Sequence, residues 1–480
     1  MERKTKIICT IGPSSEKPEI LHRMIQSGMD VARINFSHGD TEEHLAYLKA
    51  VREAAAVSGR PLAILGDLQG PKIRVGVIGG SGKIDLVPGA RFTISPSVEI
   101  GNPERVGTSY EHLAGDLSCG DAVLLDDGLL KLIVEKIEGR DVHCRVEVGG
   151  VLSSHKGLNL PGVKINLPAL TAKDKVDLAF MIEHGFDFAA LSFVQSAEDI
   201  RLMKESIGQT GGEIKIVAKI EKPQALDHLT EILSEVNGVM VARGDLGVEL
   251  NVERVPSAQK RILRAASEAN VLSITATQML ESMTSNPVPT RAEASDVANA
   301  VYDGTDALML SGETAVGRYP VQTVAMAAAI AREAEKTTES WCGPYLTQHR
   351  AGATFHEAIC HAAADSARDL GAAAIVVGSQ SGYTVLLMSK FRPPVPIVGI
   401  SSDERAVRLM AAMYGVYPVR LPRMDDLEES ITLATGHLVS AGFGGEGDVV
   451  VMTFGAPLQG QGRTNMLRLI RIGEKNTPEN

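Results

Sequence analysis

The chain has 480 residues, a length typical of roughly two to four domains with sizeable hydrophobic cores. Its 44% hydrophobic and 22% charged content is that of an ordinary globular protein, and its net charge of −11 argues against general nucleic-acid binding. Five scattered cysteines without a CxxC pair indicate neither a disulfide framework nor a zinc site. We find no signal peptide or membrane-spanning run, so we expect a cytoplasmic protein without membrane contacts.

The first 70 residues alternate short apolar runs with amphipathic segments. The apolar runs have the length and composition of buried strands, and the amphipathic segments carry helical spacing with capping residues. We therefore predict three strands with a helix after each of the first two, the third strand ending in a Gly-Asp pair. The strands are expected at 6–12, 31–36 and 62–68, and the helices at 18–27 and 41–57.

Residues 71–167 lose this alternation. They are rich in Gly and Pro and contain short alternating segments separated by turn signals, which predicts an inserted small β domain without helices. The sequence Asp126–Gly128 is typical of a hairpin turn in this domain. The strands are expected at 83–87, 91–94, 122–125, 130–137 and 142–148.

The strand–helix alternation resumes at residue 172. Eight strand–helix units, interrupted once, are the number that a (β/α)8 TIM barrel requires, and a doubly wound open sheet is the competing interpretation. The further strands are expected at 188–193, 214–220, 239–242, 272–277 and 307–310, and the helices at 172–184, 197–207, 226–236, 257–269, 291–302 and 321–335.

A linker near Trp341–Pro344 leads to a third domain, for which we predict an α/β fold with a mostly parallel sheet. The predicted division is 1–70 with 168–345 for the barrel, 71–167 for the inserted β-barrel-like lid domain, and 346–480 for the C-terminal domain. Its helices are expected at 355–370, 384–390, 403–413 and 426–441, and its strands at 373–378, 397–400, 417–421 and 448–454.

Chemically capable side chains stand where seven of the eight barrel strands end, which is where barrel active sites lie. Lys219 and Glu221 are two residues apart, so they project to the same side at the end of one strand. The next strand ends in Gly244 and Asp245. Two carboxylates and a lysine on neighbouring strand ends suit a divalent cation bound to a phosphorylated substrate.

Several long motifs resemble those of the pyruvate kinase family. The resemblance implies a barrel with a β domain inserted after its third strand, a C-terminal α/β domain, a homotetramer and allosteric regulation. It also implies phosphoryl transfer from phosphoenolpyruvate to ADP, giving pyruvate and ATP in the last step of glycolysis. The motifs are Thr5–Pro13, Asn35–Gly39, Ile220–Lys222, Val241–Glu249, Ala276–Met283 and Pro289–Glu293.

The resemblance also assigns roles to the strand-end residues. Glu221 and Asp245 would bind Mg²⁺, with Mn²⁺ as a substitute, and the backbone of Gly244 and Asp245 would lie near the substrate carboxylate. Lys219 would stabilise the phosphoryl group in transit, because a fixed positive charge there meets moving negative charge. Arg33 would hold the substrate phosphate.

Thr277 would lie by the face of the enolate, whose proton donor the sequence leaves open. Arg243 is expected to form a structural ion pair rather than to take part in catalysis. Lys156, one of the positions that match nucleotide contacts, lies in the inserted domain, which implies that this domain closes as a lid over the site. The positions that match nucleotide contacts of the family are Asn35, His38, Arg74 and Lys156.

The chain departs from the family pattern at the monovalent-cation site. Many members hold K⁺ with Asn, Ser, Asp and a Thr carbonyl, and Asn35, Ser37 and Asp67 are present here. The next five residues, Leu68 to Lys72, read Leu-Gln-Gly-Pro-Lys, where the K⁺-requiring pattern is Thr-Lys-Gly-Pro-Glu. The ammonium of Lys72 could balance the substrate phosphate in place of the ion, so we hypothesise that K⁺ is not required.

A second departure concerns a small-residue loop that opens a helix in the C-terminal domain, a plausible phosphate site because helix N-termini bind anions. Relatives regulated by fructose 1,6-bisphosphate carry Lys and Arg where this chain has Gln380 and Tyr383. We therefore expect a sugar monophosphate or nucleoside monophosphate effector, or no effector. The loop residues are Ser379, Gln380, Ser381, Gly382 and Thr384.

Two other functions stay open at this point. One is a different Mg²⁺-dependent barrel enzyme acting on phosphoenolpyruvate or pyruvate enolates, such as an aldolase or a mutase. The other is a non-catalytic, effector-sensing or scaffold protein on a degenerate barrel. The nucleotide-facing set argues against the first, and the intact Lys219, Glu221, Asp245 and Thr277 argue against the second.

Overall fold

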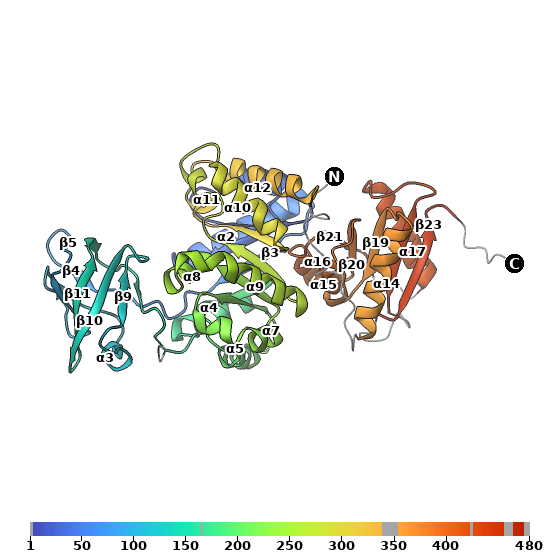
Figure 1. The fold of residues 1–480 in the computed structure, drawn as a ribbon. Helices are drawn as coiled ribbons and strands as arrows, with labels where there is room; N and C mark the ends of the chain where they lie inside the picture. Colours follow the sequence, from blue (N-terminus) through green and yellow to red (C-terminus); the bar gives the residue numbers. More distant parts are fainter. Residues whose placement is uncertain are drawn as a thin grey trace.

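The computed structural model describes residues 3–163, 165, 167–337, 354–422, 426–455 and 464–474. The predicted linker near Trp341–Pro344 lies outside these ranges. Three bodies stand in a row: the β-rich inserted domain at one end, the barrel in the middle and the C-terminal domain at the other end (Figure 1).

Eight strands form a closed parallel barrel, which confirms the barrel and excludes the open sheet. Each strand is an apolar run of four to six residues, buried along almost its whole length. The strands in chain order are β1 (Lys6–Thr10), β2 (Val31–Asn35), β3 (Ala63–Asp67), β14 (Phe188–Leu191), β15 (Lys215–Ile220), β16 (Gly238–Ala242), β17 (Leu272–Ala276) and β18 (Ala307–Leu310).

Helices cover the outside of the barrel, and several begin at side-chain caps. Thr171 and Thr290 each form a capping box with the acidic residue three positions later, which satisfies backbone N–H groups that the first helical turn leaves unpaired. The covering helices are α1 (Pro18–Ser27), α2 (Thr41–Ser58), α4 (Ala172–Glu183), α5 (Ala197–Thr210), α9 (Val255–Glu268), α10 (Arg291–Tyr302) and α12 (Pro320–Glu335).

The structure differs from the expected helices of this region in two places. The single helix expected over 226–236 is two helices, α6 (Pro223–Asp227) and α7 (Leu229–Glu235), separated at His228. A further helix, α8 (Arg243–Glu249), which was not among the expected helices, starts directly after β16. Three short helices complete this region. The 3-10 helix η1 (Val252–Arg254) precedes α9, the 3-10 helix η2 (Glu281–Thr284) follows β17, and α11 (Gly312–Ala315) follows β18.

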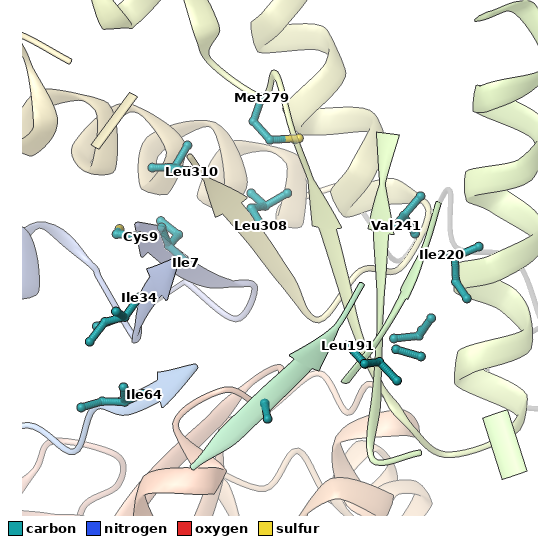
Figure 2. Close-up of a cluster of buried hydrophobic side chains, with 14 of the residues drawn as sticks. Ile7, Cys9, Ile34, Ile64, Leu191, Ile220, Val241, Met279, Leu308 and Leu310 are labelled. Atoms are coloured by element: carbon teal, nitrogen blue, oxygen red, sulfur yellow. The ribbon is translucent and has the colours of Figure 1, made fainter. Parts of the chain in front are cut away.

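Strand alternation separates two apolar layers. One layer fills the space between the strands and the helices, and its side chains come from all around the barrel, as Figure 2 shows for Ile7, Ile34, Ile64, Val241 and Leu308. The other fills the barrel interior, with Ile8, Val31, Leu65 and Val217 among its members. Because strand side chains alternate, the next inward positions toward the carboxyl ends are Thr10, Arg33, Asp67 and Lys219.

The inserted domain lies between β3 and α4 and is almost entirely β. It has a six-stranded sheet in the order β13-β9-β10-β11-β6-β8 and the two-stranded pairs β12-β5 and β4-β7. The helix α3 (Leu113–Asp116) corrects the expectation of no helix. The strands are β4 (Val77–Ile78), β5 (Lys83–Leu86), β6 (Arg91–Ile94), β7 (Ile100–Gly101), β8 (Arg105–Val106), β9 (Ala122–Leu125), β10 (Leu130–Glu138), β11 (Asp141–Val148), β12 (Gly150–Ser153) and β13 (Leu158–Asn159).

The C-terminal domain has one sheet in the order β21-β20-β19-β22-β23, parallel except for β23, so the mostly parallel sheet is confirmed. Leu409 and Ala412 join the apolar cluster of the barrel interior, so this domain covers the amino-terminal end of the barrel. Its elements are α14 (Phe355–Asp369), β19 (Ala374–Gly378), α15 (Tyr383–Lys390), β20 (Ile397–Ser401), α16 (Glu404–Met410), β21 (Val416–Arg420), α17 (Leu427–Ser440), β22 (Val449–Phe454) and β23 (Met466–Arg471).

A search of the described residues finds no helix with the length and apolar character needed to cross a membrane.

Candidate active site

A buried group of charged side chains lies at the carboxyl ends of β2, β3 and β15. Asp67 is at its centre, with 1% of its surface exposed. One oxygen of Asp67, Oδ2, accepts from Nε of Arg33 at 2.8 Å and lies 2.7 Å from Nη2. The other, Oδ1, lies 3.2 Å from Nζ of Lys219. Burial favours the neutral carboxyl, but Lys219 and Arg33 outweigh it and hold the pKa of Asp67 below its usual value.

Lys219 joins this aspartate to Glu221. Its Nζ lies 3.0 Å from Oε1 of Glu221 and donates to the hydroxyl of Ser192 at 2.7 Å. Burial lowers the pKa of Lys219, but the carboxylates of Asp67 and Glu221 more than offset this and leave the pKa raised. The side chain is therefore a fixed ammonium in a nearly enclosed site.

Glu221 is fully buried and only partly satisfied. Its Oε2 accepts from the backbone N–H of Phe193 at 2.7 Å, whereas Oε1 has an ion-pair contact with Lys219 but no hydrogen bond among the described residues. Burial raises the pKa of Glu221, Lys219 opposes the rise, and the nearby carboxylate of Asp245 adds to it. A buried oxygen lacking a hydrogen bond, near a second carboxylate, suits an oxygen-preferring divalent cation.

The helix α8 carries Gly244 and Asp245 in its first turn. The backbone N–H of Gly244 donates to Oγ1 of Thr277 at 2.9 Å, which joins the ends of β16 and β17. Thr277 and Gln278 both have positive φ angles, 68° and 54°, a conformation that costs energy in residues with a Cβ and often marks a functional site. Arg243 is structural as expected: it pairs with Asp296 at 2.7 Å and donates to backbone carbonyls.

The proposed nucleotide residues form two pairs. Asn35 is the last residue of β2 and His38 follows it, and Oδ1 of Asn35 accepts from the backbone N–H of Ser37. Arg74 and Lys156 lie in the inserted domain, where Arg74 donates to the carbonyl of His155 and Lys156 pairs with Asp126 at 2.8 Å. The described residues show no direct contact between the two pairs.

The proposed monovalent site is only partly assembled. Asp67 lies in the buried cluster, and the carbonyl of Leu68 accepts from the hydroxyl of Ser192 at 2.7 Å. Lys72 instead lines a narrow cavity between the barrel and the inserted domain, together with Lys222 and Glu249. Within the described ranges its ammonium has no ion pair and does not contact Asp67.

The effector loop separates into exposed and buried residues. Gln380 and Ser381 are exposed, and Gly382, with φ of 80°, precedes the first residue of α15. Thr384 is buried and its hydroxyl meets that of Thr464 at 2.8 Å. Where the loop faces the barrel, Ser381–Tyr383 line a cavity of about 100 Å³ between the barrel and the C-terminal domain.

Sequence reasoning gave no role to two residues that complete the buried cluster. Ser192 bridges Lys219 to β3, and Thr10 accepts from Nη1 of Arg33 at 2.8 Å. Both residues could have been identified from the alternation of side chains along a strand. Thr10 stands two positions after the inward-facing Ile8, and Ser192 stands two positions after the inward-facing Ala190.

The fold and the site define a (β/α)8-barrel enzyme with a lid-like β domain and cationic groups suited to phosphoryl transfer. Comparisons with known proteins agree. Family models described as the pyruvate kinase barrel domain and the pyruvate kinase alpha/beta domain match residues 2–324 and 357–470. The chain belongs to the pyruvate kinase family, and it is therefore a kinase.

Relatives match along the whole chain. A pyruvate kinase of Geobacillus stearothermophilus is 44% identical over 479 residues, covering 99% of this chain and 81% of that protein. A pyruvate kinase of Mycobacterium tuberculosis is 42% identical, with 99% of both chains covered. A crystal structure of a pyruvate kinase from Cryptosporidium parvum has a TM-score of 0.93 and 36% identity, covering 98% of this chain and 96% of that one.

Proposed function

We propose that this protein transfers the phosphoryl group of phosphoenolpyruvate to ADP in the cytoplasm, giving pyruvate and ATP. The observation that carries the proposal is the buried Lys219 between Asp67 and Glu221. Phosphoryl transfer requires positioning and charge neutralisation more than covalent catalysis, and this cluster supplies fixed charges in a nearly dry site.

The roles proposed for the substrate-binding residues follow from their positions. Arg33 and Lys219 present the cations that hold and stabilise the phosphoryl group, and both are oriented by the same aspartate. Gly244 and Asp245 lie in the first turn of α8, and their backbone is proposed to lie near the substrate carboxylate. Thr277 is proposed to act at the enolate, with its hydroxyl already in contact with Gly244.

The family generally uses Mg²⁺ together with a monovalent cation. We propose Glu221 and Asp245 as the divalent-cation ligands, because Glu221 has a buried oxygen lacking a hydrogen bond and interacts electrostatically with Asp245. When bound, Mg²⁺ or Mn²⁺ would neutralise charge on the transferring group. The protein's own part is to exclude water and hold its two cationic side chains in place.

The proposed function is tested by a coupled assay for ATP formed from phosphoenolpyruvate and ADP with Mg²⁺. Robust ATP formation is expected from the purified protein, and Glu221→Gln should lower it strongly while leaving the fold intact by circular dichroism. ATP formation at the parental rate by Glu221→Gln would contradict the metal assignment. No ATP formation by the unmodified protein would favour the alternative barrel enzyme or the scaffold.

K⁺-independent turnover is part of the proposal. Both oxygens of Asp67 already face protein cations, so this carboxylate does not depend on a monovalent ion for charge balance. Lys72 adds a further ammonium, which lines the narrow cavity between the barrel and the inserted domain. We expect full activity in buffer free of Na⁺ and K⁺, and a Lys72→Glu variant should become K⁺-stimulated. A many-fold rise in the rate of the unmodified protein on adding K⁺ would refute this.

Allosteric regulation is proposed at the loop Ser379–Thr384, for a sugar monophosphate or nucleoside monophosphate. The exposed loop opens α15, and it carries no basic side chain for a second phosphate. Dose–response curves at sub-saturating phosphoenolpyruvate would separate the two effector types. Stronger activation by a sugar bisphosphate than by either monophosphate would overturn the assignment.

We also propose a homotetramer and the domain division 1–70 with 168–345, 71–167 and 346–480. The strand β23 is the outer strand of its sheet, and its edge away from β22 pairs with no other strand among the described residues, so it could pair with another subunit. Its Leu469 is half exposed. Light scattering coupled to gel filtration should report four chains, and a monomer would contradict the proposal.

A further inference from the structure

The inserted domain rests on the last turn of α8 at two points. Nδ2 of Asn159, in β13, donates to Oε1 of Glu249 at 3.2 Å. Gly128, in the turn between β9 and β10, lies against the same turn, because a Cβ added there would be 3.8 Å from Cγ1 of Val248. The helix that presents Gly244 and Asp245 to the substrate therefore also bears the inserted domain.

The same carboxylate is tied to the neighbouring strand end. Nζ of Lys222 lies 2.8 Å from Oε1 of Glu249, and both side chains are about 95% buried. Lys222 directly follows Glu221, so this ion pair connects the metal-binding end of β15 to α8. The other oxygen of Glu249, Oε2, has no hydrogen-bond partner among the described residues. Removing either partner would leave a poorly compensated buried charge.

The length of α8 makes it a direct mechanical connection. It has seven residues, about two helical turns, with Gly244 and Asp245 in the first turn and Val248 and Glu249 in the last. Helical hydrogen bonds link the two turns, including the one from the N–H of Leu250 to the carbonyl of Leu246 at 2.7 Å. A shift of Glu249 therefore displaces the backbone that Thr277 holds at the other end.

We propose that Asn159, Glu249 and Lys222 form a latch that couples the position of the inserted domain to the substrate-binding end of α8. Glu249 and Asn159 are positioning residues in this scheme: they contact no reacting atom and act through Gly244 and Asp245. The proposal rests on the proposed function for its substrate. It adds that the lid sets the geometry of the phosphoenolpyruvate site even when no nucleotide is bound.

The decisive variant is Asn159→Ala, which removes the hydrogen bond from the inserted domain to Glu249 and keeps the Lys222–Glu249 pair. Asn159→Asp is a second variant, since it keeps the shape of the side chain and replaces the donor amide with a group that repels Glu249. The matched control is Lys131→Met, which breaks an exposed ion pair with Glu147 in the same lid domain.

Two measurements are made on each full-length variant without nucleotide. Hydrogen–deuterium exchange reports the amides of α8, and calorimetry reports the binding of phosphoenolpyruvate in the presence of Mg²⁺. We expect about fivefold faster exchange in α8 and about fivefold weaker binding for both Asn159 variants, because binding must then also order the helix. Lys131→Met should change neither quantity, and Glu249→Gln should weaken binding at least as much as Asn159→Ala.

The outcomes separate the latch from the proposed function. Unchanged α8 exchange in both Asn159 variants would overturn the latch, whatever the protein binds. Faster exchange with parental affinity for phosphoenolpyruvate would overturn the coupling, because the contact would then be merely structural. If the unmodified protein itself fails to bind phosphoenolpyruvate with Mg²⁺, the proposed function fails, and the exchange data still decide whether Asn159 restrains α8.

Discussion

Lys219 opposes the effect of burial on the pKa of two buried carboxylates, Asp67 and Glu221. Burial disfavours ionisation of both Asp67 and Glu221, and in each case the ammonium of Lys219 is the largest opposing influence. The lysine is in turn held protonated by the two carboxylates. The pKa values of the three groups therefore depend on one another. Loss of the lysine would change the pKa of both carboxylates as well as remove its own contacts.

We expect Lys219→Met to lower kcat by about 10²- to 10³-fold, because the variant removes a preorganised charge from the site of transfer. The matched control is Lys215→Met, on the same strand but at its opposite end, facing the C-terminal domain. Its kcat should stay within about twofold of the parent. Initial rates with circular dichroism check both variants, and parental turnover by Lys219→Met would contradict the assigned role.

Lys6 provides a test of electrostatics away from the site. Burial lowers its pKa to about 8, partly opposed by Asp30, and its Nζ donates to the carbonyl of Val416 at 2.7 Å. The folded-state pKa thus lies below the unfolded value near 10.5. Keeping the buried amine charged therefore costs stability below about pH 8, and this cost disappears as the pH rises through 10.5.

The stability of the parent relative to Lys6→Met should therefore rise by about 3 kcal/mol between pH 7 and pH 10.5, since the shift is about 2.5 units and each unit is worth about 1.4 kcal/mol. Urea unfolding at several pH values measures this difference, in which other titrating groups cancel. Lys49→Met, at an exposed helix position, is the control and should show no such trend. A pH-independent difference for Lys6→Met would refute the depressed pKa.

The barrel strands are fastened at their amino-terminal ends by a fourfold repeated contact. The residue before every second strand is Asp or Asn, and its side chain accepts from the backbone N–H of the second residue of the preceding strand. The distances are 2.7–3.0 Å. The pairs are Asp30 with Ile7, Asp187 with Ile64, Asn237 with Ile216, and Asp306 with Ser273.

Asn237→Ala tests this contact where no cation complicates it. The variant leaves the N–H of Ile216, at the start of the barrel strand β15, without its acceptor, so we expect a loss of about 2 kcal/mol in the free energy of unfolding. Asn299→Ala removes an asparagine from an exposed face of α10 and should change stability by less than about 0.5 kcal/mol. Equal stability of the two variants in urea would show that the contact contributes nothing.

At the level of elements, sequence patterns were informative where the signal is local. Apolar composition predicted the buried strands, and capping residues predicted the helix starts. The two-residue spacing of Lys219 and Glu221 predicted that they lie on the same side at the end of β15. The helix α8 was missed because Gly244 and Asp245 are typical of loops, and its two ends are held by Thr277 and Lys222, which follow other strands. Likewise, the partners of Asp67 come from two other strands, so spacing alone could not predict them.

At the level of the whole molecule, the order of the three bodies was predictable but their docking was not. Two of the strand-fastening aspartates also bind cations of the C-terminal domain: Asp187 pairs with Arg408 at 2.9 Å, and Asp306 pairs with Lys390 and Arg392. Nothing in the sequence near Asp306 indicates a partner 84 residues away. The helix α15 therefore begins at the effector loop and ends at Lys390, bound to the base of the barrel.

Lys390→Met should uncouple the C-terminal domain from the barrel. The side chain is about 97% buried and lies 2.5 Å from Oδ2 of Asp306, so its loss leaves that carboxylate to Arg392 and Ser273. Removing one partner of a buried ion pair costs about 3–5 kcal/mol of stability. Here that stability is lost at the interface between the barrel and the C-terminal domain. We expect calorimetry to show an early transition for the C-terminal domain, separate from the barrel.

The double variant Lys390→Met with Asp306→Asn should recover part of the loss, because the remaining amide needs no counter-charge. Lys336→Met, which breaks an exposed pair with Glu333, should melt like the parent. If Lys390→Met still melts in one transition at the parental midpoint, the ion pair does not join the two domains. A signal from the effector loop would then have to reach the barrel through other contacts between the two domains, such as the Asp187–Arg408 pair and the apolar contact of Leu409 and Ala412.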